Sequence, residues 1–486
     1  MLGQDRSGGT YRLYQIIGLF LGPLAFLVMA FSPAPGGLSS AGWATGALAV
    51  WIAIWWATEA LPLFVTALLP LVLLPLLGIS DINAAAAPFA NPVVFLLLGG
   101  FLIALAVERW NLHRRIAFHI ILSAGNRPRN LIGGVMLASA TLSMWISNTA
   151  TTVMMLPIAV SLVTVILPEG AARERDGINF AAAMMLGVAY AASIGGMSTL
   201  IGSPPNALAA SYLGQTFNIK VSFPQWMAIA LPIVAVMLGS AFLVLTRIAF
   251  SFSKTLASTE THIVADMLRE MGPITTPEKR VASVFLVVAV GWIFYPLIAD
   301  RVGLDLSDTS IAIAGAITLF AIPANWKERR FLLDWQTARK APFDILILFG
   351  GGLSLAQAIE SSGLALWIGN GLSFLHGMPL IVLVLGACLL ITFLTELMSN
   401  TATAAAFLPI AGSLAIGAEA APLLIGVAVA LAASSAFMLP VATLPNALVF
   451  GTGYVTLPQM LRAGFILSLI GAAVIAAGVT LAAPFL

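Results

Sequence analysis

Ser147 to Leu162 of this chain reads SNTATTVMMLPIAVSL, and Ser399 to Leu414 reads SNTATAAAFLPIAGSL. The two copies are identical at 11 of 16 positions and lie 252 residues apart. Each copy places a polar tripeptide, Ser-Asn-Thr, inside a stretch that is otherwise apolar. A match of this length indicates that the chain consists of two related halves.

Shorter matches extend the repeat on both sides. PVVFLLLGG at Pro92 to Gly100 resembles FDILILFGG at Phe343 to Gly351, and PNAL occurs at 205–208 and again at 445–448. The Gly-Gly runs in the first pair are typical of close helix packing in lipid. We therefore predict four parts, which are an N-terminus with a first span (1–40), a first repeat (41–250), a cytoplasmic linker (251–281) and a second repeat (282–486).

The composition is that of a membrane protein. Of 486 residues, 60% are hydrophobic and 9% are charged, and the mean hydropathy is +1.01, far from the balance of a soluble domain. The single cysteine, Cys388, lies in an apolar run, which excludes an intrachain disulfide and a Cys/His metal cluster. No clustered basic surface suggests nucleic acid. We predict an all-α protein whose whole chain forms one membrane domain.

Apolar runs of about 20 residues, the length that crosses a bilayer, recur throughout the chain. Two stretches, 130–167 and 379–417, are apolar but broken at their centres, and we predict that each is a re-entrant hairpin. The predicted spans are 12–31, 41–58, 61–79, 91–107, 180–213, 226–250, 282–299, 309–323, 343–360, 420–455 and 462–485.

The positions of the positive charges support eleven spans with a cytoplasmic N-terminus. In this topology 20 of the 22 lysines and arginines are cytoplasmic, and only Lys220 and Arg301 lie outside, as the positive-inside rule requires. If either broken stretch crossed fully, the asymmetry would collapse. We therefore predict a bacterial inner (plasma) membrane protein with its C-terminus outside. Because each repeat holds five spans and one hairpin, the second is inverted relative to the first.

The helix breaks indicate where a site lies. Inside hydrocarbon an unpaired backbone group costs several kcal/mol, so a break persists only where protein or a wet cavity covers it. Four breaks form two pairs. They are the two Ser-Asn-Thr tips, SIGGMSTLIGSPPN at 193–206 and LPVATLPN at 439–446.

These breaks suit an anion and a cation together. Hydroxyls, amides and the N-terminus of the helix that follows each tip can bind an anion, while freed carbonyls and amide oxygens suit sodium. Two simpler interpretations remain open. Serine and threonine within a span often bond a carbonyl one turn back, and the Gly/Pro runs can be packing kinks.

Ionisable residues in the apolar runs are few. Glu396, three residues before Ser399, is either a proton carrier or a structural acceptor at its hairpin, and we favour the acceptor. Glu59 is predicted to cap the next helix. No Ser/His/Asp constellation, P-loop or dinucleotide fingerprint is present, so we predict that the protein is not an enzyme.

Several of these segments resemble the divalent anion/sodium symporter family, the INDY-type di- and tricarboxylate transporters. The matching segments are TEALPLFVTALLPLVLLPLLGI at Thr58 to Ile79, LGGFLIALAVERWNLHRRIA at Leu98 to Ala117, both Ser-Asn-Thr motifs, and SIGGMSTLIGSPPNAL from Ser193. The resemblance covers nearly the whole chain. It implies a homodimer of eleven-span protomers, each with a scaffold and a transport domain that moves like an elevator.

The resemblance also implies two sodium sites and a substrate site. The first sodium site would use Ser143, Ser147, Asn148 and the Gly196 carbonyl, and its mirror would use Thr395, Asn400 and the carbonyls of Met398 and Ala442. The substrate carboxylates would meet Asn148, Thr149, Asn400 and Thr401, with Thr443 nearby. One residue departs from the family pattern, because Leu444 stands where relatives often carry proline.

We therefore expect sodium-coupled uptake of a C4-dicarboxylate such as succinate, malate or fumarate. Within the transport class, the alternatives are a dicarboxylate exchanger and a sodium-coupled citrate or sulfate carrier. An anion channel would use the same polar breaks but would need a continuous pore.

Overall fold

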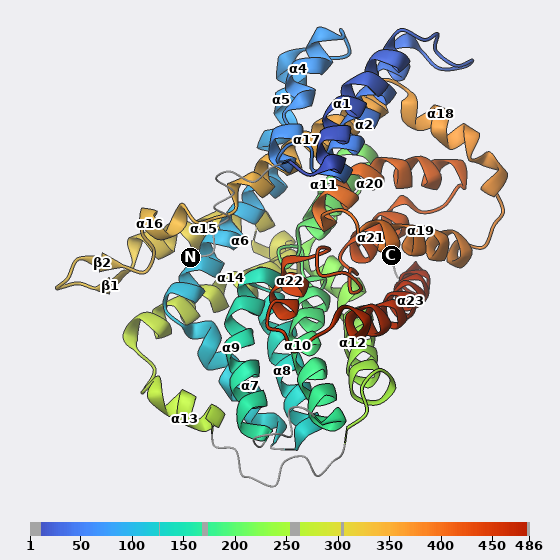
Figure 1. The fold of residues 1–486 in the computed structure, drawn as a ribbon. Helices are drawn as coiled ribbons and strands as arrows, with labels where there is room; N and C mark the ends of the chain where they lie inside the picture. The colour runs from blue at the N-terminus through green and yellow to red at the C-terminus, as the bar shows by residue number, and fades with distance from the viewer. Residues whose placement is uncertain (1–10, 126, 168–173, 253–262, 303–305, 484–486) are drawn as a thin grey trace.

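The computed structural model describes residues 11–125, 127–167, 174–252, 263–302 and 306–483, which are mainly helical (Figure 1). The predicted polar N-terminus (1–10), the middle of the predicted linker (253–262) and residues 303–305 lie outside the described residues, as do 126, 168–173 and 484–486. In the described part, nine helical segments are long and apolar enough to cross a bilayer, and four further apolar segments are shorter. The prediction of an all-α, multi-pass membrane protein is confirmed.

The described N-terminal part contains seven α-helices before the first hairpin. They are α1 (Leu13–Ala30), α2 (Ser40–Thr58), α3 (Leu63–Thr66), α4 (Leu69–Leu76), α5 (Ile82–Ala86), α6 (Pro92–Arg109) and α7 (Leu112–Ala124). The predicted span 61–79 is therefore not one helix. Pro70, at the start of α4, has no backbone N–H to continue the hydrogen-bond ladder from α3.

The prediction for Glu59 is wrong. Glu59 ends α2 in the left-handed conformation, with φ of 46°, and its carbonyl oxygen accepts a hydrogen bond from Gln15 Nε2 at 3.1 Å. The residue that precedes α3 is Pro62, and no side chain caps that helix.

Both predicted hairpins are broken where the Ser-Asn-Thr motifs stand. The first comprises α8 (Pro128–Ser143) and α9 (Asn148–Ile166), and the second comprises α19 (Leu380–Leu394) and α20 (Asn400–Gly417). Each second helix starts at the asparagine because the preceding serine is its N-cap. We call residues 143–149 the first tip and residues 395–401 the second tip.

Two further helices are interrupted in the same way. α10 (Arg175–Gly196) is followed by α11 (Pro204–Phe217), and α21 (Pro422–Ala433) is followed by α22 (Leu444–Phe450). Prolines at the first positions of α11 and α22 start a helix without needing an N–H partner. We call residues 197–203 the first break and residues 434–443 the second break.

The remaining α-helices and the two strands complete the two halves. They are α12 (Phe223–Leu243), α13 (Ile263–Glu270), α14 (Thr276–Val302), α15 (Asp308–Ala321), α16 (Trp335–Ala338), α17 (Phe343–Ser361), α18 (Leu364–Gly371), α23 (Leu457–Ala482), and a two-stranded antiparallel hairpin of β1 (Pro323–Asn325) and β2 (Arg330–Phe331).

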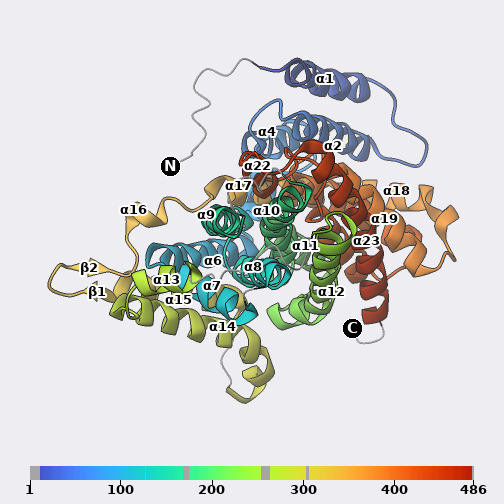
Figure 2. The same ribbon diagram turned by 60° about the horizontal axis from the view of Figure 1, so that its bottom comes forward.

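The helix that carries the first break is the most enclosed of the nine span candidates. In its apolar window 89% of the residues of α10 are buried, against 17% for α1, and Figure 2 shows α10 among other helices and α1 at the edge of the molecule. The two halves interlock around this centre, since α10 packs on α22, α11 on α20 and α21, and α12 on α23. The first break is therefore buried inside the protein, whereas the second is buried over residues 434–437 and exposed at Val441.

The Gly-Gly runs serve helix packing, as predicted. A Cβ added to Gly99 of α6 would stand 2.7 Å from the Cβ of Ala312 on α15. A Cβ added to Gly351 of α17 would overlap the carbonyl oxygen of Ala67. Only glycine lets these backbones approach so closely.

Two ion pairs join helices on the face predicted to be cytoplasmic. Arg115 Nε of α7 lies 2.9 Å from Glu278 Oε1 at the start of α14, and Arg109 of α6 lies 2.6 Å from Asp334, the N-cap of α16. Glu278 also accepts a hydrogen bond from Thr275 N at 2.7 Å. The first pair joins the end of the predicted linker to the predicted first repeat.

Candidate substrate and cation site

The first tip exposes an asparagine amide at the start of a helix. Ser147 Oγ accepts a hydrogen bond from Ala150 N at 3.2 Å, and Ser143 Oγ donates to Asn148 Oδ1 at 2.6 Å. Among the described residues, Asn148 Nδ2 has no hydrogen-bond partner. The first N–H groups of α9 also lack partners within the helix. The first tip thus offers several donors to one acceptor group, such as a carboxylate.

The second tip repeats this geometry 252 residues later. Ser399 Oγ accepts a hydrogen bond from Ala402 N at 3.3 Å, and Thr395 Oγ1 lies 2.9 Å from Asn400 Oδ1. Thr395 Oγ1 also lies 2.7 Å from the carbonyl oxygen of Ala433, which ties the second tip to the end of α21. The two tips are therefore alike in their hydrogen bonds as well as in their sequence.

At the first break, backbone carbonyl oxygens converge on a glycine. A Cβ added to Gly202 would stand 2.6 Å from the carbonyl oxygen of Gly196 and 3.0 Å from those of Ser143 and Met144. A Cβ added to Gly196 would overlap Asn148 Oδ1. Carbonyl and amide oxygens are the ligands that alkali cations take at unwound membrane helices. This cluster therefore fits sodium as a transported ion.

The structure brings most of the first predicted sodium set together. Ser143, Asn148 and Gly196 all meet at this oxygen cluster, and Ser147 lies at the same tip as the cap of α9. The carbonyl of Met144 and the residue Gly202 were not predicted. The sequence did contain a signal for Gly202. Gly196 and Gly202 are separated by five residues in SIGGMSTLIG, and glycines let the two ends of such a turn approach each other closely.

Glu396 holds the second break in place. Its carboxylate accepts hydrogen bonds from three consecutive backbone N–H groups, those of Phe437 at 2.7 Å, Met438 at 2.9 Å and Leu439 at 2.9 Å. The side chain is 1% exposed. The geometry is that of the structural acceptor we favoured. The first repeat has Met144 at the equivalent position, 252 residues earlier.

The second predicted sodium set is less closely connected. Thr395 and Asn400 meet, but within the described part of the chain no hydrogen bond ties Met398 or Ala442 to Asn400. Ala442 N donates to the Leu439 carbonyl oxygen at 3.2 Å, inside the second break.

The predicted threonines stand at helix starts. Thr149 and Thr401 are the second residues of α9 and α20. Thr443 caps α22, where its Oγ1 accepts a hydrogen bond from Asn446 N at 3.2 Å. Leu444, which follows it, is 57% exposed.

The two breaks touch, so both pairs of polar segments form one region. Ser203 Oγ of the first break lies 3.0 Å from Ser434 Oγ of the second. Tyr190 of α10 donates from its hydroxyl to the carbonyl oxygen of Phe437 at 2.6 Å. The first hairpin packs on α22 through α9, and the second packs on α11 through α20.

No lysine or arginine occurs in the segments that build this region. The sequence has none in 130–167, 177–219 or 341–461. The negative charge of an anion bound there must therefore be stabilised by helix N-termini, by amide and hydroxyl donors, and by any cation bound beside it.

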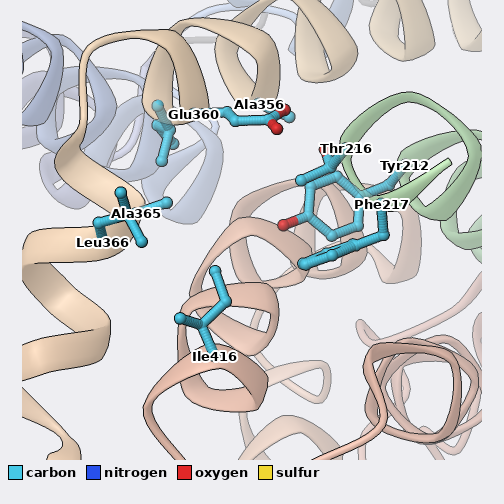
Figure 3. A pocket seen from close by; sticks show the side chains of 9 residues that line it. Tyr212, Thr216, Phe217, Ala356, Glu360, Ala365, Leu366 and Ile416 are labelled. Carbon is cyan, nitrogen blue, oxygen red and sulfur yellow. The ribbon is translucent and has the colours of Figure 1, made fainter. Parts of the chain in front are cut away.

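A separate cavity of about 180 Å³ lies between α11, α17, α18 and α20 (Figure 3). Of its nine lining residues Glu360 alone is charged, and Tyr212 and Thr216 supply hydroxyls. Its lining includes no residue of either tip or of either break, so the cavity is distinct from the candidate anion site.

A multi-pass helical protein with paired polar helix breaks is typical of the class of membrane transporters. The chain matches the family described as the sodium:sulfate symporter transmembrane region over residues 14–483. It belongs to that family, and it is a transporter rather than an enzyme.

Two relatives are similar over nearly their full lengths. The sodium-dependent dicarboxylate transporter SdcS of Staphylococcus saprophyticus is 39% identical over 476 residues, which cover 97% of this chain and 92% of the relative. SdcS of Staphylococcus aureus strain USA300 is 40% identical over 467 residues, which cover 95% and 90%.

A solved structure supports the fold. The YdaH transporter of Alcanivorax borkumensis superimposes with a TM-score of 0.53 over 97% of both chains. At 15% identity this likeness concerns the fold alone.

Proposed function

We propose that this protein is a sodium-coupled secondary transporter that imports C4-dicarboxylates such as succinate, malate and fumarate. The observation that carries the proposal is the pair of tips. In the described part of the chain, Nδ2 of Asn148 and of Asn400 has no hydrogen-bond partner, and carbonyl oxygens cluster beside Asn148. Two such donor sets suit a ligand with two carboxylates. The relatives named sodium-dependent dicarboxylate transporters support the same substrate class.

Sodium is the counter-charge in this proposal. Import of a dianion works against a membrane potential that costs about 2.3 kcal/mol per charge per 100 mV. Three or more sodium ions make the import of one dianion electrically favourable. Because the site lacks lysine and arginine, bound sodium also neutralises the substrate.

In this proposal the substrate carboxylates bind Asn148, Thr149, Asn400 and Thr401, with Thr443 nearby. One sodium ion binds Ser143, Ser147, Asn148 and the Gly196 carbonyl. A second binds Thr395, Asn400 and the carbonyls of Met398 and Ala442.

The proposed architecture is an inverted repeat of eleven spans and two re-entrant hairpins in a homodimer. The repeats are 41–250 and 282–486, the N-terminus is cytoplasmic, and the C-terminus lies outside the bacterial inner membrane. Transport proceeds by alternating access, in which one domain carries the site across the membrane like an elevator.

Uptake by proteoliposomes tests the proposal. Labelled succinate should accumulate with an inward sodium gradient and not with potassium or choline. Equal uptake with all three cations would reject sodium coupling. Uptake that requires succinate inside the vesicle would identify an exchanger, and preferential uptake of citrate or sulfate would change the substrate. Sustained single-molecule conductance would identify an anion channel.

A further inference from the structure

Asn206 and Asn446 make the same pair of hydrogen bonds in the two repeats. Asn206 Nδ2 donates to the carbonyl oxygens of Gly196 at 2.9 Å and Thr199 at 2.7 Å. Asn446 Nδ2 donates to those of Ala436 at 3.2 Å and Leu439 at 3.0 Å. In both repeats the acceptors precede the asparagine by ten and seven residues. Each asparagine is the third residue of the helix that follows its break.

These hydrogen bonds show which residues of the first break correspond to which residues of the second. The asparagines lie 240 residues apart, which pairs Gly196 with Ala436 and Gly202 with Ala442. The tips keep an offset of 252, so the second repeat is twelve residues shorter between tip and break. The residue equivalent to Gly196 is thus Ala436.

The asparagines fix carbonyl groups at the cation site. Gly196 is the last residue of α10, and its carbonyl oxygen belongs to the cluster around Gly202. A carbonyl oxygen has two lone pairs, so one can accept the Asn206 N–H while the other faces a cation. By donating to one lone pair of the Gly196 carbonyl oxygen, Asn206 sets the direction of the other lone pair.

Burying these two asparagine side chains costs free energy that a segment serving only to connect two helices would not need to spend. Both asparagines are fully buried, and Oδ1 of each lacks a partner among the described residues. A buried acceptor without a hydrogen bond destabilises the fold. The same costly arrangement in both repeats indicates that the Nδ2 contacts serve the site.

We propose that Asn206 and Asn446 are the positioning residues of the two cation sites, where they orient the carbonyls of Gly196 and Ala436. This inference rests on the proposed function, because it assumes that sodium binds at the breaks. Ala436 then supplies a carbonyl in the second site that the family resemblance did not indicate.

The test is ion binding to purified protein without dicarboxylate. Thermal stability is measured in titrations with sodium and with lithium for the wild type, Asn206→Leu and Asn446→Leu, and the wild type is also titrated with potassium and with choline. Leucine has a similar volume but no donor. The matched control is Ser211→Ala on α11, since Ser211 is also buried and its hydroxyl has no partner among the described residues.

Each leucine variant should raise the half-saturating sodium concentration at least tenfold and change the sodium-to-lithium ratio, while Ser211→Ala changes neither. A lower melting temperature with unchanged ion affinities and ratio would overturn the inference. If leucine prevents folding, Asn206→Ser and Asn446→Ser are measured with the same criteria. If these also fail to fold, the asparagines support the fold itself and the inference is rejected. A wild type that responds equally to sodium, potassium and choline would instead reject the proposed function.

Discussion

The hydroxyl oxygens of Ser203 and Ser434 lie 3.0 Å apart, so the break in the first repeat touches the break in the second. The two residues are 231 positions apart in the chain. In the proposed elevator, α10, α11, α21 and α22 travel together with the bound ligand. The distance between these two residues should then stay constant during transport.

A cross-link between these positions tests this consequence. With Ser203→Cys and Ser434→Cys combined, mercuric ion should bridge the thiols, and at least half of the succinate uptake should remain. Each single cysteine variant treated with mercury is the control. All variants also carry Cys388→Ala, which removes the native thiol. Uptake abolished in the double variant alone would contradict a shared movement of the two breaks.

The asparagines of the tips should be essential for substrate binding. Asn148→Leu or Asn400→Leu removes an amide whose Nδ2 has no partner among the described residues and whose Oδ1 contacts a hydroxyl of the same tip. Succinate affinity measured by calorimetry in sodium should fall at least tenfold for either variant. Asn83→Leu, at an exposed position on α5, is the control. Unchanged affinity in both tip variants would remove the basis of the proposed site.

The sequence predicted the places of the polar breaks because a break inside an apolar run has few physical explanations. It also predicted that Ser143 and Thr395 are equivalent, from their constant offset. It did not predict the contribution of Met144 or Gly202, because the direction of a carbonyl depends on how another segment, more than 50 residues away, turns against it. The role of Glu396 needed the structure for the same reason, since its three donors lie 41 to 43 residues further along the chain.

The ion pair of Arg115 and Glu278 should make stability depend on pH. Burial alone would raise the pKa of Glu278, but the hydrogen bonds from Arg115 and Thr275 outweigh it and lower the pKa below the ordinary value. A carboxylate with a lowered pKa stabilises the fold above its ordinary pKa, about 4.3, and this contribution disappears as the pH falls through the lower folded-state value.

Glu278→Gln should therefore lower the melting temperature of solubilised protein at pH 7 by a few degrees. The difference from the wild type should shrink below about pH 4. Asp266→Asn is the control, because Asp266 pairs with Arg269 while both side chains are exposed, and such pairs contribute little. A difference that stays constant down to pH 3 would show that charge is not responsible.

Glu396→Gln distinguishes a structural acceptor from a proton carrier. Glutamine has one acceptor oxygen, so one of the three N–H groups at the second break would face an amide donor instead. The maximal rate of uptake should fall several-fold while its pH dependence stays that of the wild type. Glu419→Gln, at an exposed residue, should change neither. A pH dependence that vanishes in Glu396→Gln would identify a proton carrier.

The oxygen cluster around Gly202 leads to a prediction with a matched control in the same repeat. Gly202→Ala would place a methyl group 2.6 Å from the Gly196 carbonyl oxygen and 3.0 Å from two others. The carbonyls must then separate, and the distances to a bound cation would change. Sodium-dependent uptake should fall at least tenfold, and sodium should no longer stabilise the protein against heat.

Gly239→Ala on α12 is the control, because a Cβ at this position meets no atom within 4 Å. It should leave uptake unchanged and raise helix stability slightly, since alanine favours a helix more than glycine does. If Gly202→Ala transports with wild-type sodium affinity, the carbonyls around Gly202 do not bind the coupling ion.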